Sequence, residues 1–317
     1  MKQAGNTNGE LPFKTIILTT FLSMLFGANA VAVKISLSGL GVYTTAAIRF
    51  GGAALLLLIW SRLGHKNLRI NRKQFGQLVL LTLIFFLQIS FFYSGQSRTS
   101  ASHGVLIANI VPFVIMILAH FLLPDDRINT RKVVGLLFGF AGVALVFSDS
   151  LQVSTHHSLQ GDILIVCAVL FWGCNATFVK RIISDYTPLQ ITIYPMLLGT
   201  PLYTICAILF DEPMITSLSS RVILSMLYQT VVTATFGFII WNGLVSKYGA
   251  TTLHSFLFIM PVSGVFFGIL LLGDPVTSSL IGSIALVTMG LLVITRGPFR
   301  KIKKQQLEHF SPDISKR

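Results

Sequence analysis

The sequence predicts an all-α fold: a polytopic membrane protein of ten transmembrane helices in two inverted five-helix repeats. Composition, segment length and an internal repeat predict it. Of the 317 residues, 53% are hydrophobic and only 11% are charged, and the mean hydropathy is +0.76. Soluble domains carry roughly 25% charged residues. The composition therefore excludes an ordinary soluble domain and indicates a membrane protein.

Long apolar stretches follow one another along the chain. A helix of about 20 apolar residues crosses a bilayer. Ten stretches have a suitable length, and we expect spans at 14–35, 42–60, 75–96, 102–123, 132–149, 162–183, 188–210, 221–242, 250–272 and 278–295. The first stretch is long, lacks a small-residue cleavage site and is followed by further spans. We therefore expect it to be retained rather than removed as a signal peptide.

Two segments of the chain are nearly alike. Residues 27–34 read Gly-Ala-Asn-Ala-Val-Ala-Val-Lys and residues 173–180 read Gly-Cys-Asn-Ala-Thr-Phe-Val-Lys, identical at five of eight positions. The repeat predicts five parts: an N-terminal tail 1–13, a first repeat 14–149, an outer linker 150–161, a second repeat 162–296 and a basic C-terminal tail 297–317. Each repeat holds an odd number of helices, so the second enters the membrane from the opposite side. Inverted repeats are typical of secondary transporters with a substrate site near the midplane.

The net charge of +13 comes from basic residues whose distribution along the chain agrees with the predicted topology. If the N-terminus is inside, twenty Lys and Arg residues lie in inside segments, and only Lys34, Arg98 and Arg221 lie outside. Basic residues are enriched in cytoplasmic loops. We therefore expect a multi-pass protein of the cell (inner or plasma) membrane with both termini in the cytoplasm. The bilayer is then the partner of the basic segments, and no nucleic acid is expected.

Several motifs occur twice and in the same order. Besides the Gly-x-Asn-Ala…Lys segments, they include Pro112 and Pro261 in the fourth and ninth spans, and Asp126 and Asp274 after them. With Arg49-Phe50 and the closing Ala-Gly-Val-Ala-Leu, they resemble the EamA-type transporters of the drug/metabolite transporter superfamily. The resemblance covers nearly the whole chain and implies a ten-helix carrier, in a family with many exporters of amino acids or other metabolites. The family pattern usually has Glu where this chain has Asp126 and Asp274.

Arg49 is the only charged residue well inside an expected span. An arginine at the centre of a membrane helix costs roughly 2.5–3.5 kcal/mol on insertion scales. A partner or a polar cavity usually offsets such a cost. One hypothesis is that Arg49 faces the substrate path and pairs with an anionic group such as a carboxylate. The alternative is that it caps carbonyls or snorkels towards the membrane surface.

Other polar and aromatic side chains suit a small-molecule site, which is mostly apolar with a few placed polar groups. The predicted substrate path consists of Asn29, Arg49, Gln88, Tyr93, Asn109, Asn175, Gln229, Trp241, Asn242 and His254. The alternative for each is a hydrogen bond or packing contact between helices. Pro112 and Pro261 are expected to kink their helices, either beside a cavity or for close packing.

The sequence gives little support for an enzyme, and we expect no metal and no cofactor. There is no G-x-x-x-x-G-K-[ST] loop for a nucleotide. His156-His157 lacks the further ligands that a metal site needs. All eleven acidic residues lie in loops, tails or span ends, which argues against a carboxylate-centred proton antiport. His103, His120 and His254 remain as titratable candidates.

We therefore predict a transporter that exports a small organic metabolite, an amino acid or similar, by alternating access. One alternative is a sugar-phosphate or nucleotide-sugar exchanger, which would need several basic residues in the cavity. Another is a membrane sensor or assembly subunit that does not transport. The patterns Gly135-x-x-x-Gly139 and Gly264-x-x-x-Gly268 predict close packing within the molecule, with a homodimer as the alternative.

Overall fold

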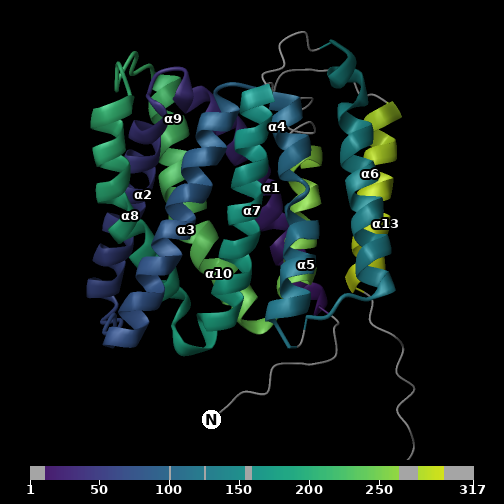
Figure 1. Cartoon of the computed structure of the whole chain (residues 1–317), viewed down its shortest axis with the longest axis horizontal. Helices are drawn as coiled ribbons and strands as arrows, with labels where there is room; N and C mark the ends of the chain where they lie inside the picture. The colour runs from purple at the N-terminus through teal and green to yellow at the C-terminus, as the bar shows by residue number, and fades with distance from the viewer. Residues whose placement is uncertain (1–10, 100, 125, 154–158, 264–277, 296–317) are drawn as a thin grey trace, which may run out of the picture.

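A computed structural model describes residues 11–99, 101–124, 126–153, 159–263 and 278–295. Every named element in these ranges is a helix, and the helices stand side by side in one bundle (Figure 1). Six are long and apolar enough to cross a membrane: Phe13–Leu37, Val42–Leu63, Arg72–Gln96, Leu159–Asp185, Pro188–Phe210 and Ser220–Lys247. Shorter apolar helices cover Leu106–Leu122, Ala250–Ser263 and Ile281–Thr295. An all-helical, multi-pass membrane protein is confirmed, and the count of ten spans stays a prediction.

The α-helices keep close to the expected spans. They are α1 Phe13–Leu37, α2 Val42–Leu63, α3 Arg72–Gln96, α4 Ala101–Ala108, α5 Val111–Leu122, α6 Thr130–Val153, α7 Leu159–Ile182, α8 Pro188–Phe210, α9 Ser220–Leu227, α10 Phe238–Lys247, α11 Ala250–His254 and α13 Ser278–Thr295. Three segments depart from α geometry: the 3-10 helices η1 Ile183–Asp185 and η3 Ser255–Phe258, and the π-helix η2 Tyr228–Gly237.

Capping boxes begin two of the long helices. Asn71 Oδ1 accepts from the backbone N–H of Gln74 at 2.8 Å, and Gln74 Oε1 accepts from the N–H of Asn71 at 2.9 Å. Thr187 and Gln190 form the same box at the start of α8. Each box satisfies N–H groups that a helix start leaves unpaired. Both boxes lie at the face of the bundle where α1 begins, which we call the N-terminal face (Figure 1).

The two expected proline kinks are helix interruptions. Because Pro112 has no N–H for the carbonyl of Ala108, α4 ends at Ala108 and α5 begins at Val111 after a short turn. The 3-10 segment η3 directly precedes the helical turn that contains Pro261. Both segments thus change geometry just before their proline, which a membrane helix tolerates where other groups satisfy the freed carbonyls.

Helices α6 and α13 pack closely as a pair (Figure 1). A Cβ atom built on Gly290 would lie 2.5 Å from the backbone oxygen of Gly135. One built on Gly139 would lie 2.3 Å from Cδ2 of Phe258. The Gly135-x-x-x-Gly139 pattern therefore packs within the chain. Gly264 and Gly268 lie outside the described residues, as does Asp274.

Helix α8 is joined at one end to the start of α2 and, near its other end, to the connection that follows α2. Away from the N-terminal face, the backbone N–H and the Oγ1 of Thr44 donate to Asp211 Oδ2 at 2.7 Å and 2.9 Å. At the N-terminal face, the hydroxyl of Tyr194 donates to the carbonyl of Leu68 at 2.6 Å. These contacts hold the two helices that form one wall of the central cavity.

Candidate functional site

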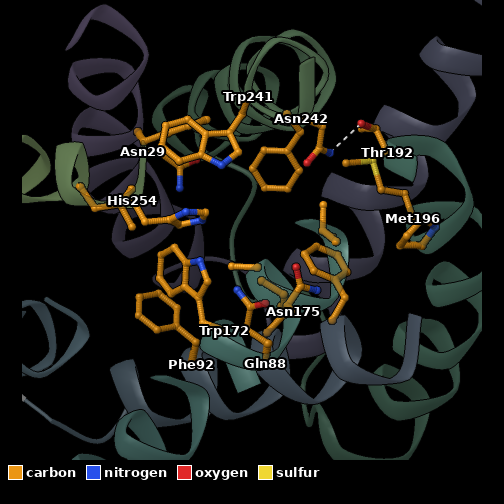
Figure 2. Close-up of a pocket in the computed structure, with 18 of the residues that line it drawn as sticks. Asn29, Gln88, Phe92, Trp172, Asn175, Thr192, Met196, Trp241, Asn242 and His254 are labelled. Atoms are coloured by element: carbon orange, nitrogen blue, oxygen red, sulfur yellow. Dashed lines mark hydrogen bonds between the residues drawn. The ribbon is translucent and has the colours of Figure 1, made fainter. Parts of the chain in front are cut away.

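A cavity lies inside the bundle, between α1, α2, α3, α7, α8, α10 and α11 (Figure 2). Its volume, counted as the space open to the centre of a water molecule, is about 200 Å³. One water needs roughly 10–15 Å³ on this measure. The cavity thus has room for a solute as large as an amino acid.

The structure brings eight of the ten predicted path residues to this cavity. They are Asn29, Arg49, Gln88, Tyr93, Asn175, Trp241, Asn242 and His254. The other two do not line it. Asn109 is buried in the turn between α4 and α5. The amide nitrogen of Gln229 donates to the carbonyl of Ala32 at 3.1 Å and to Ser36 Oγ at 2.6 Å, so this side chain joins η2 to α1.

Arg49 is almost completely buried, with 4% of its surface exposed. It lies in α2, about 10 Å along the helix axis from its first residue. Its Nη1 donates to the hydroxyl of Tyr93 at 2.7 Å and its Nη2 to Thr233 Oγ1 at 3.2 Å. Its Nε is buried and has no hydrogen-bond partner in the described part of the chain. The guanidinium is therefore anchored by two neutral oxygens, and part of its hydrogen-bonding capacity is unused.

Asn29 and Asn175 come from α1 and α7 and reach the same cavity (Figure 2). Asn29 Oδ1 lies 2.9 Å from Thr233 Oγ1, so Asn29 belongs to the hydrogen-bond network of Arg49. The amides of Asn175 and Gln88, by contrast, make no hydrogen bond to any described residue. Their polar atoms are therefore available to a solute in the cavity.

Aromatic rings form much of the remaining wall. Trp172 and Trp241 point towards the same space from α7 and α10 (Figure 2). Trp172 contacts Phe92 edge to face at 6.3 Å between ring centroids, and Trp241 contacts His254 at 5.2 Å. Rings of this size bury apolar area while the indole N–H remains a donor. The cavity therefore suits a solute with an apolar body.

His254 presents a ring nitrogen to the cavity. Its Nδ1 lies 2.8 Å from the carbonyl oxygen of Ala250. A carbonyl only accepts hydrogen bonds, so Nδ1 carries a hydrogen, and in the neutral form of the ring Nε2 is an acceptor. Figure 2 shows the ring directed into the cavity. A hydroxyl or N–H of a solute could donate to it.

Asn242 and Thr192 join α10 to α8 at the cavity wall. The amide nitrogen of Asn242 donates to Thr192 Oγ1 at 2.9 Å (Figure 2). Thr192 in turn donates to the carbonyl of Pro188 at 2.7 Å. The carbonyl oxygen of Asn242 remains available as a further acceptor.

The other two histidine candidates do not contribute to this wall. His120 Nδ1 accepts from the backbone N–H of Ile128 at 3.2 Å, in the connection between α5 and α6. The side chain of His103 and the pair His156-His157 lie outside the described residues. No group of His, Cys, Asp and Glu in the described ranges is arranged to hold a metal ion.

Several wall residues are absent from the predicted path, notably Phe26, Trp172, Thr192 and Met196. Phe26 and Trp172 each precede one of the paired asparagines by three residues. Residues three apart share a helix face, so this spacing could have found both rings. Thr192 and Met196, four apart on α8, carry no comparable signal in the sequence.

The sequence model of the EamA-like transporter family matches residues 13–148 and again residues 159–296. The chain belongs to the EamA-like transporter family. One similar protein is the uncharacterized transporter YyaM of Bacillus subtilis (strain 168), 26% identical over 91% of this chain and 97% of its own length. A probable amino-acid metabolite efflux pump of Escherichia coli (strain K12) is 23% identical over 87% of this chain and 93% of its own length. A solved structure titled "Crystal structure of protein" shares the fold, with a TM-score of 0.76 and 17% identity over 88% of this chain and 97% of that one.

The two EamA matches relate residues of the cavity to one another. They begin at residues 13 and 159, a shift of 146 positions. The same shift relates Asn29 to Asn175, and both residues line the cavity. The first copy contributes Asn29 and the second contributes Asn175 at the equivalent position, and among the described lining residues only Arg49, from the first copy, is a lysine, arginine, aspartate or glutamate.

Proposed function

We propose that this EamA protein exports a small organic metabolite, an amino acid or a similar compound, by alternating access through the central cavity. The observation that carries the proposal is that equivalent residues of the two matched segments, Asn29 and Asn175, line one cavity. Transporters built from repeats typically bind their substrate where the repeats meet. The name of the Escherichia coli relative, an amino-acid metabolite efflux pump, supports this class of substrate.

The proposed architecture is ten transmembrane helices in two inverted halves with both termini in the cytoplasm. Six long helices are in place. Four further crossings would come from α4 with α5, from α6, from the helical segment Ala250–Ser263 and from α13. The double family match supports two halves, and the distribution of basic residues supports the orientation.

Two contacts at opposite faces are the proposed gates. At the N-terminal face, Thr15 Oγ1 and the hydroxyl of Tyr248 lie 3.0 Å apart. At the opposite face, Thr99 Oγ1 donates to Asp162 Oδ1 at 2.5 Å. Each contact joins the start of a broken span, α11 or α4, to the start of a first helix, α1 or α7. In alternating access the two contacts would open in turn.

The test is efflux from liposomes that contain the purified protein. The lumen is loaded with the twenty amino acids and their N-acetyl derivatives, and mass spectrometry follows what leaves. We expect one compound or a small set to leave faster than from protein-free liposomes. If nothing leaves faster, with and without a pH gradient, the proposal is wrong.

The alternatives gain no support from the described residues. Arg49 is the one cation that lines the cavity there, whereas a sugar-phosphate or nucleotide-sugar exchanger calls for several. A sensor would bind a solute without moving it, which the same liposomes combined with a binding measurement would reveal.

A further inference from the structure

We infer that the cavity selects monoanions: solutes with one carboxylate, which binds Arg49, and with no free ammonium group. This inference narrows the proposed substrates to compounds that are similar to amino acids but carry no free ammonium group, and so it disfavours the free amino acids themselves. It rests on the proposed function and on the same cavity, but not on the direction of transport. It combines the unpaired charge of Arg49, the geometry of its free donors and the neutrality of the remaining wall.

The charge of Arg49 has no counter-charge in the described part of the chain. No described Asp or Glu lines the cavity, and no ion pair to Arg49 occurs within the described ranges. The ring of Phe50 lies 5.0 Å from the guanidinium carbon and that of Phe238 lies 6.0 Å away. Ring faces stabilise a cation by roughly 0.5–2 kcal/mol. A buried charge is normally paired, so an anionic solute would supply what the protein does not.

The free donors of Arg49 suit a carboxylate. A guanidinium has five N–H groups in a fixed plane, and the bonds to Tyr93 and Thr233 use two of them. Because these oxygens come from α3 and η2, they fix the plane from two sides. Nε is buried and has no partner among the described residues. Arginine binds carboxylates through two parallel N–H groups of this kind.

The rest of the wall offers polar groups without charge. These are the amides of Asn175 and Gln88, the carbonyl oxygen of Asn242 and the acceptor nitrogen of His254. They can bind a hydroxyl, an amide or an N–H group. An ammonium group would lose its hydration and find no carboxylate, and the second charge of a phosphate monoester would stay unpaired. Monoanions are therefore favoured over zwitterions, cations and dianions of the same size.

The experiment compares solutes with the same phenyl body and different charge. The probes are 3-phenylpropionate and N-acetylphenylalanine as monoanions, phenylalanine as zwitterion, 2-phenylethylamine as cation and phenyl phosphate as dianion. Binding to the purified protein is followed by tryptophan fluorescence, since Trp172 and Trp241 line the cavity. We expect at least one monoanion to bind about tenfold or more tightly than the amine, and more tightly than the zwitterion and the dianion.

Two variants assign the preference to Arg49. R49Q should weaken binding of that monoanion about tenfold or more and abolish its advantage over the amine. R49K keeps the charge without the planar fork, so the preference should persist at lower affinity. If R49Q does not fold, the order of binding affinities of the five probes for the unaltered protein tests the inference.

The outcomes separate this inference from the proposed function. Equal or tighter binding of the amine, the zwitterion or the dianion overturns the inference, as does unchanged monoanion binding by folded R49Q. The inference is equally wrong if no probe binds while the liposomes show efflux of a zwitterion or a cation. If a monoanion binds but no compound leaves the liposomes, the inference stands and the proposed transport is wrong.

Discussion

Thr233 connects two polar side chains of the cavity wall. Its Oγ1 accepts from Arg49 Nη2 at 3.2 Å and lies 2.9 Å from Asn29 Oδ1. It is fully buried, so no water can replace it without rearrangement of the wall. The position of the guanidinium therefore depends on a hydroxyl that touches no solute in the proposed site.

Thr233→Val should disturb this network while keeping the shape of the side chain. We expect a loss of about 1–3 kcal/mol in stability, because the buried partners of the hydroxyl are left unsatisfied. Thermal unfolding of the purified variant measures the loss, and Thr233→Ser should restore most of it. Thr204→Val is the matched control, since exposed Thr204 bonds only within its own helix. Equal melting of Thr233→Val and Thr204→Val would contradict the role of Thr233.

The predicted path residues that line the cavity include three that break a local rule in the sequence. Arg49 is a charge within an apolar span, and Asn29 and Asn175 are polar residues at repeated positions. The contacts of Gln229 and Thr233 are harder to predict from the sequence because both residues lie in the π-helix η2. There the Oγ1 of Thr235 bonds the carbonyl of Thr230, five residues earlier. A π-turn places residues on faces that the α-helical period does not predict, so Thr233 contacts Arg49 and Gln229 contacts α1.

At the scale of elements, glycine decides how closely α6 and α13 pack. A Cβ on Gly290 would lie 2.5 Å from a backbone oxygen of α6, which cannot move aside as a flexible side chain can. The space around the Cβ position of a glycine therefore predicts whether that glycine tolerates substitution by alanine.

Gly290→Ala should separate the two helices and lower stability by about 1–3 kcal/mol, the usual cost of overpacking. Gly76→Ala is the control, because nothing lies within 4 Å of its Cβ position in α3. That substitution should leave stability unchanged or raise it by up to about 1 kcal/mol through helix propensity. Melting temperature and monodisperse yield in detergent measure both. A Gly290→Ala variant as stable as Gly76→Ala would show that α6 and α13 are not packed as described.

The Asp211 carboxylate fixes the first turn of α2 against the end of α8. Asp211→Ala removes the acceptor of the Thr44 N–H, and loss of such a cap costs about 0.5–2 kcal/mol. Asp185→Ala, which removes an exposed carboxylate from η1, should change stability little. Thermal unfolding compares the two variants, and a larger loss in Asp185→Ala would refute the capping role.

The lengths of the apolar stretches predict where the long helices lie, and α8 has the bounds that the sequence predicts. Proline indicated where two spans are irregular but not the form of the irregularity. Whether a helix bends or stops depends on what satisfies the freed carbonyl, which is a property of the neighbouring helices. The ends of α2 and α8 likewise depend on Asp211 and Tyr194, which contact residues far away in the sequence.

At the scale of the whole molecule, the proposed gates lie at opposite faces, and blocking either should stop transport. In a variant whose three cysteines are replaced, the pairs Thr99→Cys with Asp162→Cys and Thr15→Cys with Tyr248→Cys can be joined by a short bifunctional thiol reagent. We expect each crosslink to abolish efflux and a cleavable reagent to allow recovery on reduction. The single-cysteine variants should keep their efflux after the same treatment. Full efflux through fully crosslinked protein would contradict alternating access at these contacts.

At this scale, the internal repeat is the feature of the sequence from which equivalent positions in the two halves can be predicted. It relates Asn29 to Asn175 but gives no reason why Arg49 is the one lysine or arginine among the described residues that line the cavity. That asymmetry places a single positive charge in a neutral, aromatic site, and it is the basis of the expected preference for monoanions.

The central claim is that solute crosses the membrane through this cavity. Its most direct test compares efflux from liposomes holding the unaltered protein, Asn175→Leu or Leu170→Ala, at equal amounts of folded protein. Asn175 reaches the cavity from α7, whereas Leu170 lies on the same helix and is 51% exposed on the outside of the bundle. The account predicts that Asn175→Leu slows efflux about tenfold or more and that Leu170→Ala leaves it unchanged. Equal efflux through all three proteins would contradict it.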